Sequence, residues 1–149
     1  MRLTAFTDYS LRVVIYLAYA PEGRSTIAEV AQAFGISENH LTKVVHLLGK
    51  HGILANTRGR GGGLRLGRPA AAINVGEVVR LAEGGDAPAE CFNHAGSGCA
   101  LAGGCGLEQV LGEAIGKFYE VLSRYSVADL AMKPAVLEKL YSLRQSKVA

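Results

Sequence analysis

The sequence predicts a mainly α-helical chain: a winged helix-turn-helix, followed by a cysteine-bearing loop and a long C-terminal dimerisation helix. Three observations predict this fold class. Two helical segments, 27–34 and 38–51, are joined by a short turn that contains glycine, as in a helix-turn-helix. Two strand-like segments with a glycine-rich tip come next, which is typical of a wing. An apolar stripe of helical period then runs for about five turns from residue 107.

A first helix is predicted near the amino terminus, with Thr7 as its N-cap and Asp8 in its first turn. The apolar run 13–20 resembles a signal peptide, but Asp8 in the leader and Pro21 after the expected cleavage site argue against one. We therefore expect a cytoplasmic protein, in which thiols stay reduced. The predicted apolar face of this helix is Leu11, Val14, Ile15 and Ala18.

Cap and stop signals define the two helices of the helix-turn-helix. Thr26 and Glu29 have the spacing of a capping box, and Gly35 ends that helix. Ser37 is the expected N-cap of the next helix, which Gly52 ends. In such a unit the second helix enters the major groove of DNA. Its predicted buried stripe is Leu41, Val44, Val45 and Leu48.

The outward side chains of the second helix are polar and can hydrogen-bond bases or phosphates. A helical hairpin with a solvated face is the alternative. Residues 1–70 carry nine Lys/Arg against four Asp/Glu, whereas residues 71–149 carry seven against nine, so the first half is the expected anion-binding module. The candidate DNA contacts on this helix are Ser37, Asn39, His40, Thr42, Lys43, His46 and Lys50.

The wing is predicted over residues 53–58 and 64–66, on either side of the glycine-rich tip 59–63. A glycine-rich dinucleotide loop is the alternative, but such a loop opens a helix, whereas here a strand-like segment follows. Arginines on the wing could reach phosphates or the minor groove. They are Arg58, Arg60, Arg65 and Arg68.

Two further helices are expected, one on each side of the cysteines. Asn74 and Glu77 resemble the start of the first, which the pair Gly84-Gly85 ends. The stripe from residue 107 packs either within the chain or in a dimer seam, and we favour the seam because a winged helix usually reads two half-sites as a dimer. A short helix and a polar tail are expected over residues 127–149. The predicted domains are 1–84 for DNA binding, 85–106 for the cysteine loop, and 107–149 for dimerisation and the tail.

All three cysteines, Cys91, Cys99 and Cys105, lie in one glycine-rich loop. Their odd number excludes complete pairing as disulfides, and inert buried thiols suit so few large apolar neighbours poorly. Zinc with His94 as fourth ligand is one alternative, although the usual C-x2-C pairs are missing; a thiol redox switch is another. An iron–sulfur cluster fits better. Its fourth ligand could be His94, Glu108, a residue of a partner subunit or a small molecule.

Four segments resemble the bacterial iron–sulfur winged-helix regulators, the family that includes IscR and RirA: MRLTAFTDYSLRVVIYLA, TIAEVAQAFGISENHLTKVVHLLGKHGIL, RGRGGGLRLGRP and AECF. The resemblance spans roughly residues 1–130 and is strongest to the nitric-oxide-sensing repressors of that family. It implies that Cys91, Cys99 and Cys105 hold a [4Fe-4S] cluster, or alternatively a [2Fe-2S] cluster. Glu108 stands where IscR-like members have a histidine, which argues against that branch. In nitric-oxide-sensing members an aspartate of the other subunit can complete the site, and Asp8 matches its position.

The resemblance also implies a mechanism. A homodimer with an intact cluster would bind double-stranded operator DNA and repress nitric-oxide detoxification genes, and nitrosylation of the cluster would release the DNA. Loss of a ligand that crosses the dimer would let the first helix shift against the helix-turn-helix. An iron- or redox-responsive regulator of the same family is the alternative function. An electron-transfer enzyme is the alternative from another class, but no catalytic arrangement in the sequence supports an enzyme, and no apolar run is long enough to suggest a membrane partner.

Overall fold

The computed structural model describes residues 2–57, 63–85, 89, 92, 99–101, 104–130 and 133–145, except for the side chains of residues 134 and 141–145. The predictions for Arg58, Arg60, Cys91 and His94 lie outside these residues. Short 3-10 turns are formed by Pro21–Gly23, Ala70–Ala72 and Val127–Asp129. The helices are α1 (Ala5–Tyr19), α2 (Ile27–Phe34), α3 (Glu38–Lys50), α4 (Val75–Glu83), α5 (Gly106–Leu122) and α6 (Pro134–Gln145), and the strands are β1 (Leu54–Thr57) and β2 (Gly63–Leu66).

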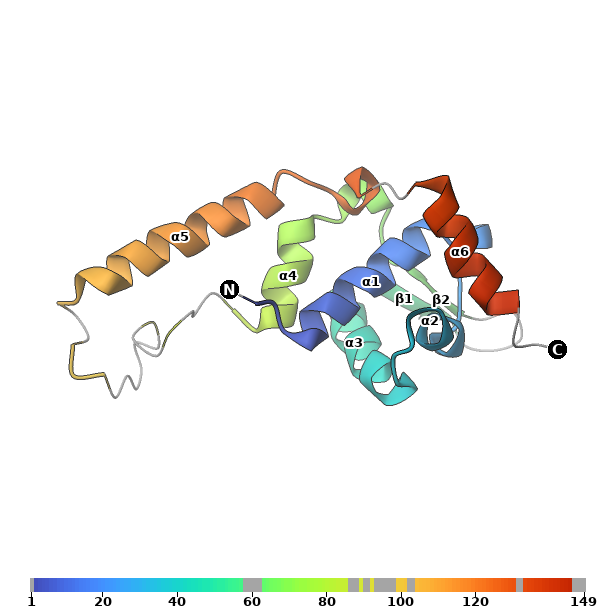
Figure 1. Cartoon of the computed structure of the whole chain (residues 1–149), viewed down its shortest axis with the longest axis horizontal. Coiled ribbons are helices and arrows are strands. Elements are labelled where there is room, and N and C mark those ends of the chain that lie inside the picture. The colour runs from blue at the N-terminus through green and yellow to red at the C-terminus, as the bar shows by residue number, and fades with distance from the viewer. Residues whose placement is uncertain are drawn as a thin grey trace.

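Helix α1 lies at the centre of the winged-helix body, where it contacts α3, α4 and β2 (Figure 1). Its N-cap is Thr4, whose hydroxyl accepts a hydrogen bond from the backbone N–H of Thr7 at 3.2 Å. The prediction of Thr7 as the cap is therefore wrong. Thr7 lies inside the first turn and is fully buried, and its hydroxyl donates to Glu83 at the end of α4. Thr4 thus caps α1 through a local bond, whereas Thr7 is buried against a partner far away in the sequence.

The buried face of α1 is also broader than the predicted stripe. Of the predicted positions only Val14 is fully buried, whereas Leu11, Ile15 and Ala18 are half-buried. Because α3 and α4 both pack against α1, two sides of the helix are covered instead of one. The buried residues of α1 are Thr7, Ser10, Val13, Val14, Tyr16 and Leu17.

The helix-turn-helix forms as predicted. Thr26 and Glu29 make both hydrogen bonds of a capping box at the start of α2. Gly35 ends α2 in the left-handed conformation, with φ of 64°, which glycine adopts without strain. The hydroxyl of Ser37 accepts from the backbone N–H of His40 at 3.3 Å and caps α3. The predicted stripe of α3 is buried: Leu41, Val44, Val45 and Leu48.

The wing is an antiparallel pair in which Leu54 is opposite Leu66 and Thr57 is opposite Gly63. It is tied to the chain just before α2, because the backbones of Ser25 and Leu64 exchange two hydrogen bonds of 2.9 and 2.7 Å. A Cβ on Gly63 would lie 2.9 Å from the carbonyl oxygen of Ser25, so the close approach of these backbones needs a glycine there. The predicted wing is thus confirmed, and its base is rigidly joined to the helix-turn-helix.

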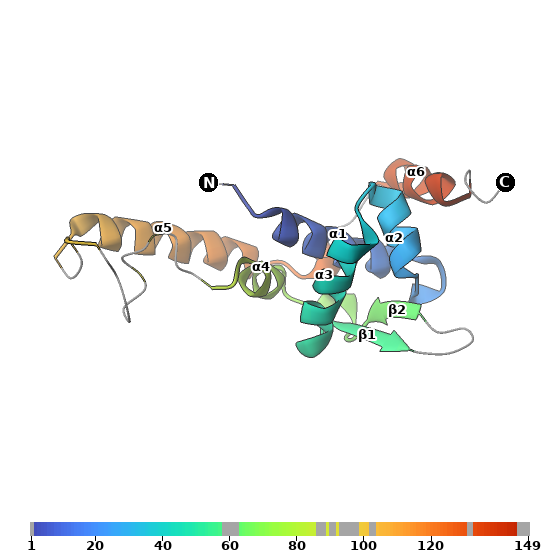
Figure 2. The same ribbon diagram turned by 90° about the horizontal axis from the view of Figure 1, so that it is seen from below.

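Helix α5 projects away from the winged-helix body, and only its carboxyl-terminal end lies beside α4 (Figures 1 and 2). Its apolar stripe is left open in the described chain: Leu107 is 60% exposed and Val110 is 62% exposed. Tyr119, which the predicted stripe did not include, is the buried residue of this helix. The long helix is present as expected, with an apolar surface that its own described chain does not cover.

After α5 the chain returns to the body. Val127 is fully buried in the core, and α6 packs against α2, where Leu140 contacts the core (Figure 1). Within the described ranges, none of the helices has the length and apolar character that crossing a membrane requires.

Candidate nucleic-acid interface and metal centre

Helix α3 presents one polar face outward while its opposite face anchors it in the core. Ser37 serves first as the cap of this helix, and the hydroxyl of Thr42 donates to the carbonyl of Glu38 at 2.8 Å. Because the buried stripe holds α3 in place, the polar groups are displayed together on one rigid element. All the candidate contacts of this helix are exposed: Ser37, Asn39, His40, Thr42, Lys43, His46 and Lys50.

A shallow hollow connects this face to the wing. It is lined by Thr42, Val45, His46, Gly49 and Lys50 of α3, together with Ile27 and Asn56. Sequence reasoning missed Asn56, although its exposed position on a strand beside basic residues is a signal that could have found it. The hollow joins the polar face of α3 to β1 across a mainly apolar floor.

The two described wing arginines have different environments. Arg65 is exposed on β2, where it is opposite Ala55. Arg68 is half-buried, with its guanidinium 2.8 Å from a carboxylate oxygen of Glu77 and 3.4 Å from the carbonyl of Ala72. Arg65 is therefore available to a phosphate, whereas Arg68 joins the base of the wing to α4.

Cys99 and Cys105 are both half-buried thiols. Cys105 occupies the N-cap position of α5 and makes no capping hydrogen bond with its side chain. The first N–H groups of a helix lack intrahelical partners and favour a negatively charged group nearby. A Cβ placed on Gly104 or Gly106 would meet nothing within 4 Å, so neither glycine is closely packed, and Cys105 lines an open hollow. This donor chemistry and this space fit an iron–sulfur cluster.

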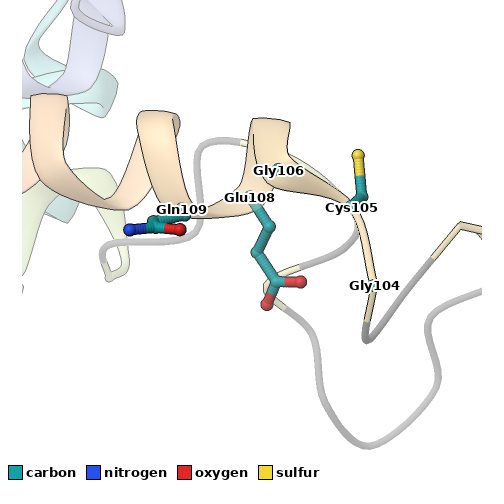
Figure 3. A pocket seen from close by; sticks show the side chains of 5 residues that line it. All are labelled: Gly104, Cys105, Gly106, Glu108 and Gln109. Atoms are coloured by element: carbon teal, nitrogen blue, oxygen red, sulfur yellow. The ribbon is translucent and has the colours of Figure 1, made fainter.

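Cys105 and Glu108 line the same open hollow, together with Gly104, Gly106 and Gln109. Their side chains nevertheless point to opposite sides of the chain (Figure 3). In this conformation the Glu108 carboxylate is not directed at the space beside the thiol. Among the residues that the structure describes, no three His, Cys, Asp or Glu side chains come together as a metal site.

Asp8 lies in the first turn of α1. Figures 1 and 2 show α1 away from the amino-terminal end of α5, which Cys105 precedes in the same chain. It is half-exposed and pairs with Arg12 one turn further on, at 2.8 Å. The Arg12 guanidinium also lies 5.7 Å from the ring centre of Phe34, at the end of α2. The neighbouring Tyr9 has its ring centre 6.2 Å from that of His40, in the first turn of α3. The turn that carries Asp8 therefore touches both helices of the helix-turn-helix.

Glu83 is a further residue that sequence reasoning missed. One of its carboxylate oxygens accepts hydrogen bonds from the N–H and hydroxyl of Thr4, at 2.9 and 3.1 Å, and from the hydroxyl of Thr7. Burial acts to raise the pKa of Glu83, but the hydrogen bonds from Thr7 and Thr4 outweigh it and hold that pKa below its ordinary value. Glu83 thereby joins the base of the cysteine loop to the first turn of α1.

An exposed polar helix and a basic wing define the class of winged helix-turn-helix transcription regulators. The separate loop of thiols is a candidate metal-binding element. The chain belongs to the Rrf2 family, described as iron-dependent transcriptional regulators, which it matches over residues 3–133. It is 42% identical over 148 residues to the HTH-type transcriptional regulator NsrR of Shouchella clausii (strain KSM-K16), and the matched residues cover 99% of each of the two chains. The resemblance inferred from the sequence is confirmed, and these relatives are transcription regulators rather than enzymes.

Solved structures agree on the fold. The chain is similar to CymR (YrzC), the global cysteine regulator of B. subtilis, with a TM-score of 0.68 and 26% identity over 88% of this chain and 96% of that one. It also matches the oxidized form of Staphylococcus aureus CymR, with a TM-score of 0.70 and 23% identity over 89% and 98% of the two chains. T. potens IscR gives a TM-score of 0.68 and 24% identity over 87% and 85%. The predicted winged helix-turn-helix is confirmed.

Proposed function

We propose that this chain is a homodimeric iron–sulfur repressor that releases operator DNA when nitric oxide reacts with its cluster. One observation carries the proposal. The amino-terminal end of α5, which Cys105 precedes, lies away from α1 in Figure 1, and the described part of the chain leaves the apolar stripe of α5 uncovered. A second subunit packed on that stripe would bury it and would bring its own α1 toward the thiols. The 42% identity to a regulator named NsrR supports the same proposal.

The residues that would hold the cluster are Cys91, Cys99 and Cys105 of one subunit and Asp8 of the other. His94, Glu108 and a small molecule remain the alternatives for the fourth position. We propose a [4Fe-4S] cluster, with [2Fe-2S] as the alternative. When bound, the cluster supplies iron atoms with which nitric oxide reacts.

The chain's own residues can carry the signal from the cluster site to the DNA-binding face. An Asp8 carboxylate that faces a partner's thiols has a different position from one that pairs with Arg12, as it does here. Arg12 packs over Phe34, and Tyr9 packs against His40, so a movement of this turn reaches α2 and α3 together. A hundredfold loss of DNA affinity requires a differential stabilisation of only ~2.7 kcal/mol.

DNA binding would use the exposed face of α3 and the wing. Lys43 and Arg65 are exposed cations on these two elements and would bind phosphates, while polar groups such as Asn39 would read base edges. Arg58 and Arg60 would extend the wing contacts. We expect binding to an inverted repeat, with half-sites about one helical turn apart, that weakens steeply as salt is added.

The test uses anaerobically purified protein and promoter DNA, with and without nitric oxide. Cys99→Ala is expected to abolish both the cluster absorbance and operator binding. A variant that keeps both would show that this loop does not supply the ligands. Operator binding that persists after nitric oxide treatment of the wild type would favour the iron- or redox-responsive alternative.

Asp8→Ala tests the ligand from the second subunit. With three thiols left, a cluster should still form, but it should be more labile or react differently with nitric oxide. Glu138→Ala, which removes an exposed carboxylate from α6, is the matched control. An unchanged absorbance spectrum and an unchanged reaction rate in Asp8→Ala would remove Asp8 from the ligand set.

A further inference from the structure

The carboxyl-terminal end of α5 is fastened to the amino-terminal end of α4 by one shared side chain. The side-chain oxygen Oδ1 of Asn74 accepts from the backbone N–H of Glu77 at 3.1 Å and so caps α4. The Asn74 amide nitrogen donates to the backbone carbonyl of Ser123 at 2.7 Å, at the end of α5. A single asparagine therefore satisfies free backbone groups at the ends of two helices.

The backbones around Asn74 are also joined directly. The N–H of Val75 donates to the carbonyl of Tyr125 at 3.0 Å, and the N–H of Val127 donates to the carbonyl of Ile73 at 2.9 Å. These bonds flank the pairing of Asn74 with Ser126. The connection between α5 and the body is therefore a hydrogen-bonded corner.

Close packing completes this corner. A Cβ on Gly76 would lie 2.5 Å from the Ser123 hydroxyl oxygen and 3.1 Å from the Ser123 backbone nitrogen, so α4 and α5 meet where no side chain fits. One turn away, later in α4 and earlier in α5, the guanidinium of Arg80 lies 4.0 Å from the ring centre of Tyr119, which is 5% exposed. We call these five residues the elbow: Asn74, Gly76, Arg80, Tyr119 and Ser123.

The direction of α5 depends on this elbow because the rest of α5 stands clear of the body (Figures 1 and 2). Its 17 residues span about 25 Å at about 1.5 Å per residue. A rotation of about 10° at one end would move the other end by about 4 Å over that length. One base pair of DNA advances by about 3.4 Å, so a change of this size is comparable to one base pair of half-site spacing.

We propose that the elbow sets the separation of the two α3 helices in the dimer, and thereby the half-site spacing that the dimer accepts. Asn74 acts as a positioning residue, since it lies in the elbow and acts through α5. This inference rests on the proposed function, because it assumes a dimer that is formed through α5 and reads two half-sites.

Asn74→Asp is the discriminating substitution. Aspartate caps a helix N-terminus as well as asparagine does, so α4 keeps its cap. The amide donor to the Ser123 carbonyl is replaced by a carboxylate oxygen, which cannot donate and repels that carbonyl. Ser123→Ala is the matched control, because it removes only the hydroxyl and leaves the backbone carbonyl in place. Gly76→Ala is a second route to the same effect, since its new methyl group would push the helices apart.

The experiment uses the cluster-loaded protein and duplexes that the wild type selects from random-sequence DNA. Affinity is measured on the selected site and on sites with one or two base pairs added to or removed from the spacer. Wild type and Ser123→Ala should lose affinity about tenfold or more for one base pair of change. Asn74→Asp and Gly76→Ala should lose about threefold or less and bind the selected site more weakly. Binding to a single half-site and the cluster absorbance should stay within error of the wild type. The melting temperature of Asn74→Asp and Gly76→Ala should fall by a few degrees, because each variant loses a hydrogen bond or close packing at the elbow.

The outcomes separate this inference from the function on which it rests. A wild type that neither dimerises nor prefers paired half-sites would overturn the proposed function and this inference with it. A wild type that reads paired half-sites, with Asn74→Asp and Gly76→Ala variants that keep its spacing profile, would overturn the elbow alone. If Asn74→Asp fails to fold, Gly76→Ala decides the matter, because alanine favours a helix more than glycine does.

Discussion

The hydrogen bonds between Glu83 and the first turn of α1 hold together the end of α4, just before the cysteine loop, and the start of α1. Their contribution to stability can be tested quantitatively. Three donors from Thr4 and Thr7 converge on one carboxylate oxygen, and Thr7 is fully buried. Hydrogen bonds to a charged group are worth more than neutral ones, at about 1.5–3 kcal/mol each against about 0.5–1.5 kcal/mol. The Glu83 side chain is partly exposed to solvent, so we use the lower end of these ranges.

Glu83→Gln keeps an acceptor oxygen but removes the charge, and we expect a loss of about 1 kcal/mol in the free energy of unfolding. Glu83→Ala removes the acceptor, and we expect a loss of about 2–3 kcal/mol. The loss stays moderate because the Thr7 hydroxyl keeps the Thr4 hydroxyl as a partner at 3.0 Å. For a chain of this size each kcal/mol lowers the melting temperature by about 2–4 °C.

The pH dependence follows from the lowered pKa of Glu83. Since its folded-state pKa lies below the ordinary value of 4.5, its stabilisation is fully present above that value. The stabilisation is lost as the pH falls through the folded-state pKa. The difference between wild type and Glu83→Gln should therefore be constant from about pH 5.5 to 7.5 and should shrink below about pH 4.

Urea denaturation of the metal-free chain at several pH values measures this difference. Glu22→Gln is the control, because Glu22 pairs with Arg24 on the surface, where an ion pair contributes little. Equal midpoints for wild type and Glu83→Gln at pH 7 would refute the reasoning. A difference that grew as the pH fell toward 4 would contradict the assigned direction of the pKa shift.

Four other substitutions test the DNA-binding body. Leu41→Ala empties a site that is 1% exposed and should lower the unfolding free energy by about 2–5 kcal/mol in urea titrations; a loss below 1 kcal/mol would mean that α3 is not anchored there. Gly35→Ala should cost about 1 kcal/mol through backbone strain alone, since its φ is 64° and its Cβ would meet nothing, whereas Gly49→Ala inside α3 should not destabilise. Lys43→Gln should reduce the slope of log affinity against log salt by about 1, and an unchanged slope would exclude a phosphate contact.

Elements whose signals act within one helical turn could be predicted from the sequence alone. The capping box of Thr26 and Glu29 and the cap at Ser37 depend on neighbours three residues away, and both are present. The start of α1 could not be predicted in this way. Thr4 and Thr7 are both possible caps by residue type, and the sequence does not show that Thr7 is buried against Glu83, 76 residues away along the chain. Packing on two sides then widened the buried face beyond one stripe.

The candidate site also has parts that the sequence predicts and parts that it does not. The spacing of the cysteines and the polar face of α3 are visible in the sequence, because residue type and helical period define them. The part played by Tyr119 is not visible, because it is buried through contact with Arg80 of another helix. The role of Asp8 as a ligand was inferred from a family resemblance and not from any pattern in the residues. The structure shows it paired with Arg12, and its role as a ligand stays a prediction.

The contacts of α1, α4 and α5 have a consequence for the proposed mechanism. Glu83 ties the first turn of α1 to the end of α4, and Asn74 ties the start of α4 to the end of α5. A displacement of Asp8 would therefore be passed on to three connected helices, α1, α4 and α5, rather than to a single turn. If Asp8 is a ligand of the partner subunit's cluster, its release would disturb the hydrogen bonds of Glu83 and Asn74. It would also disturb the contact between Tyr9 and His40. Weakening the hydrogen bonds of either Glu83 or Asn74 should then reduce the difference in DNA affinity between the cluster-loaded and the nitric-oxide-treated protein. We expect this although neither residue is a proposed DNA contact or cluster ligand.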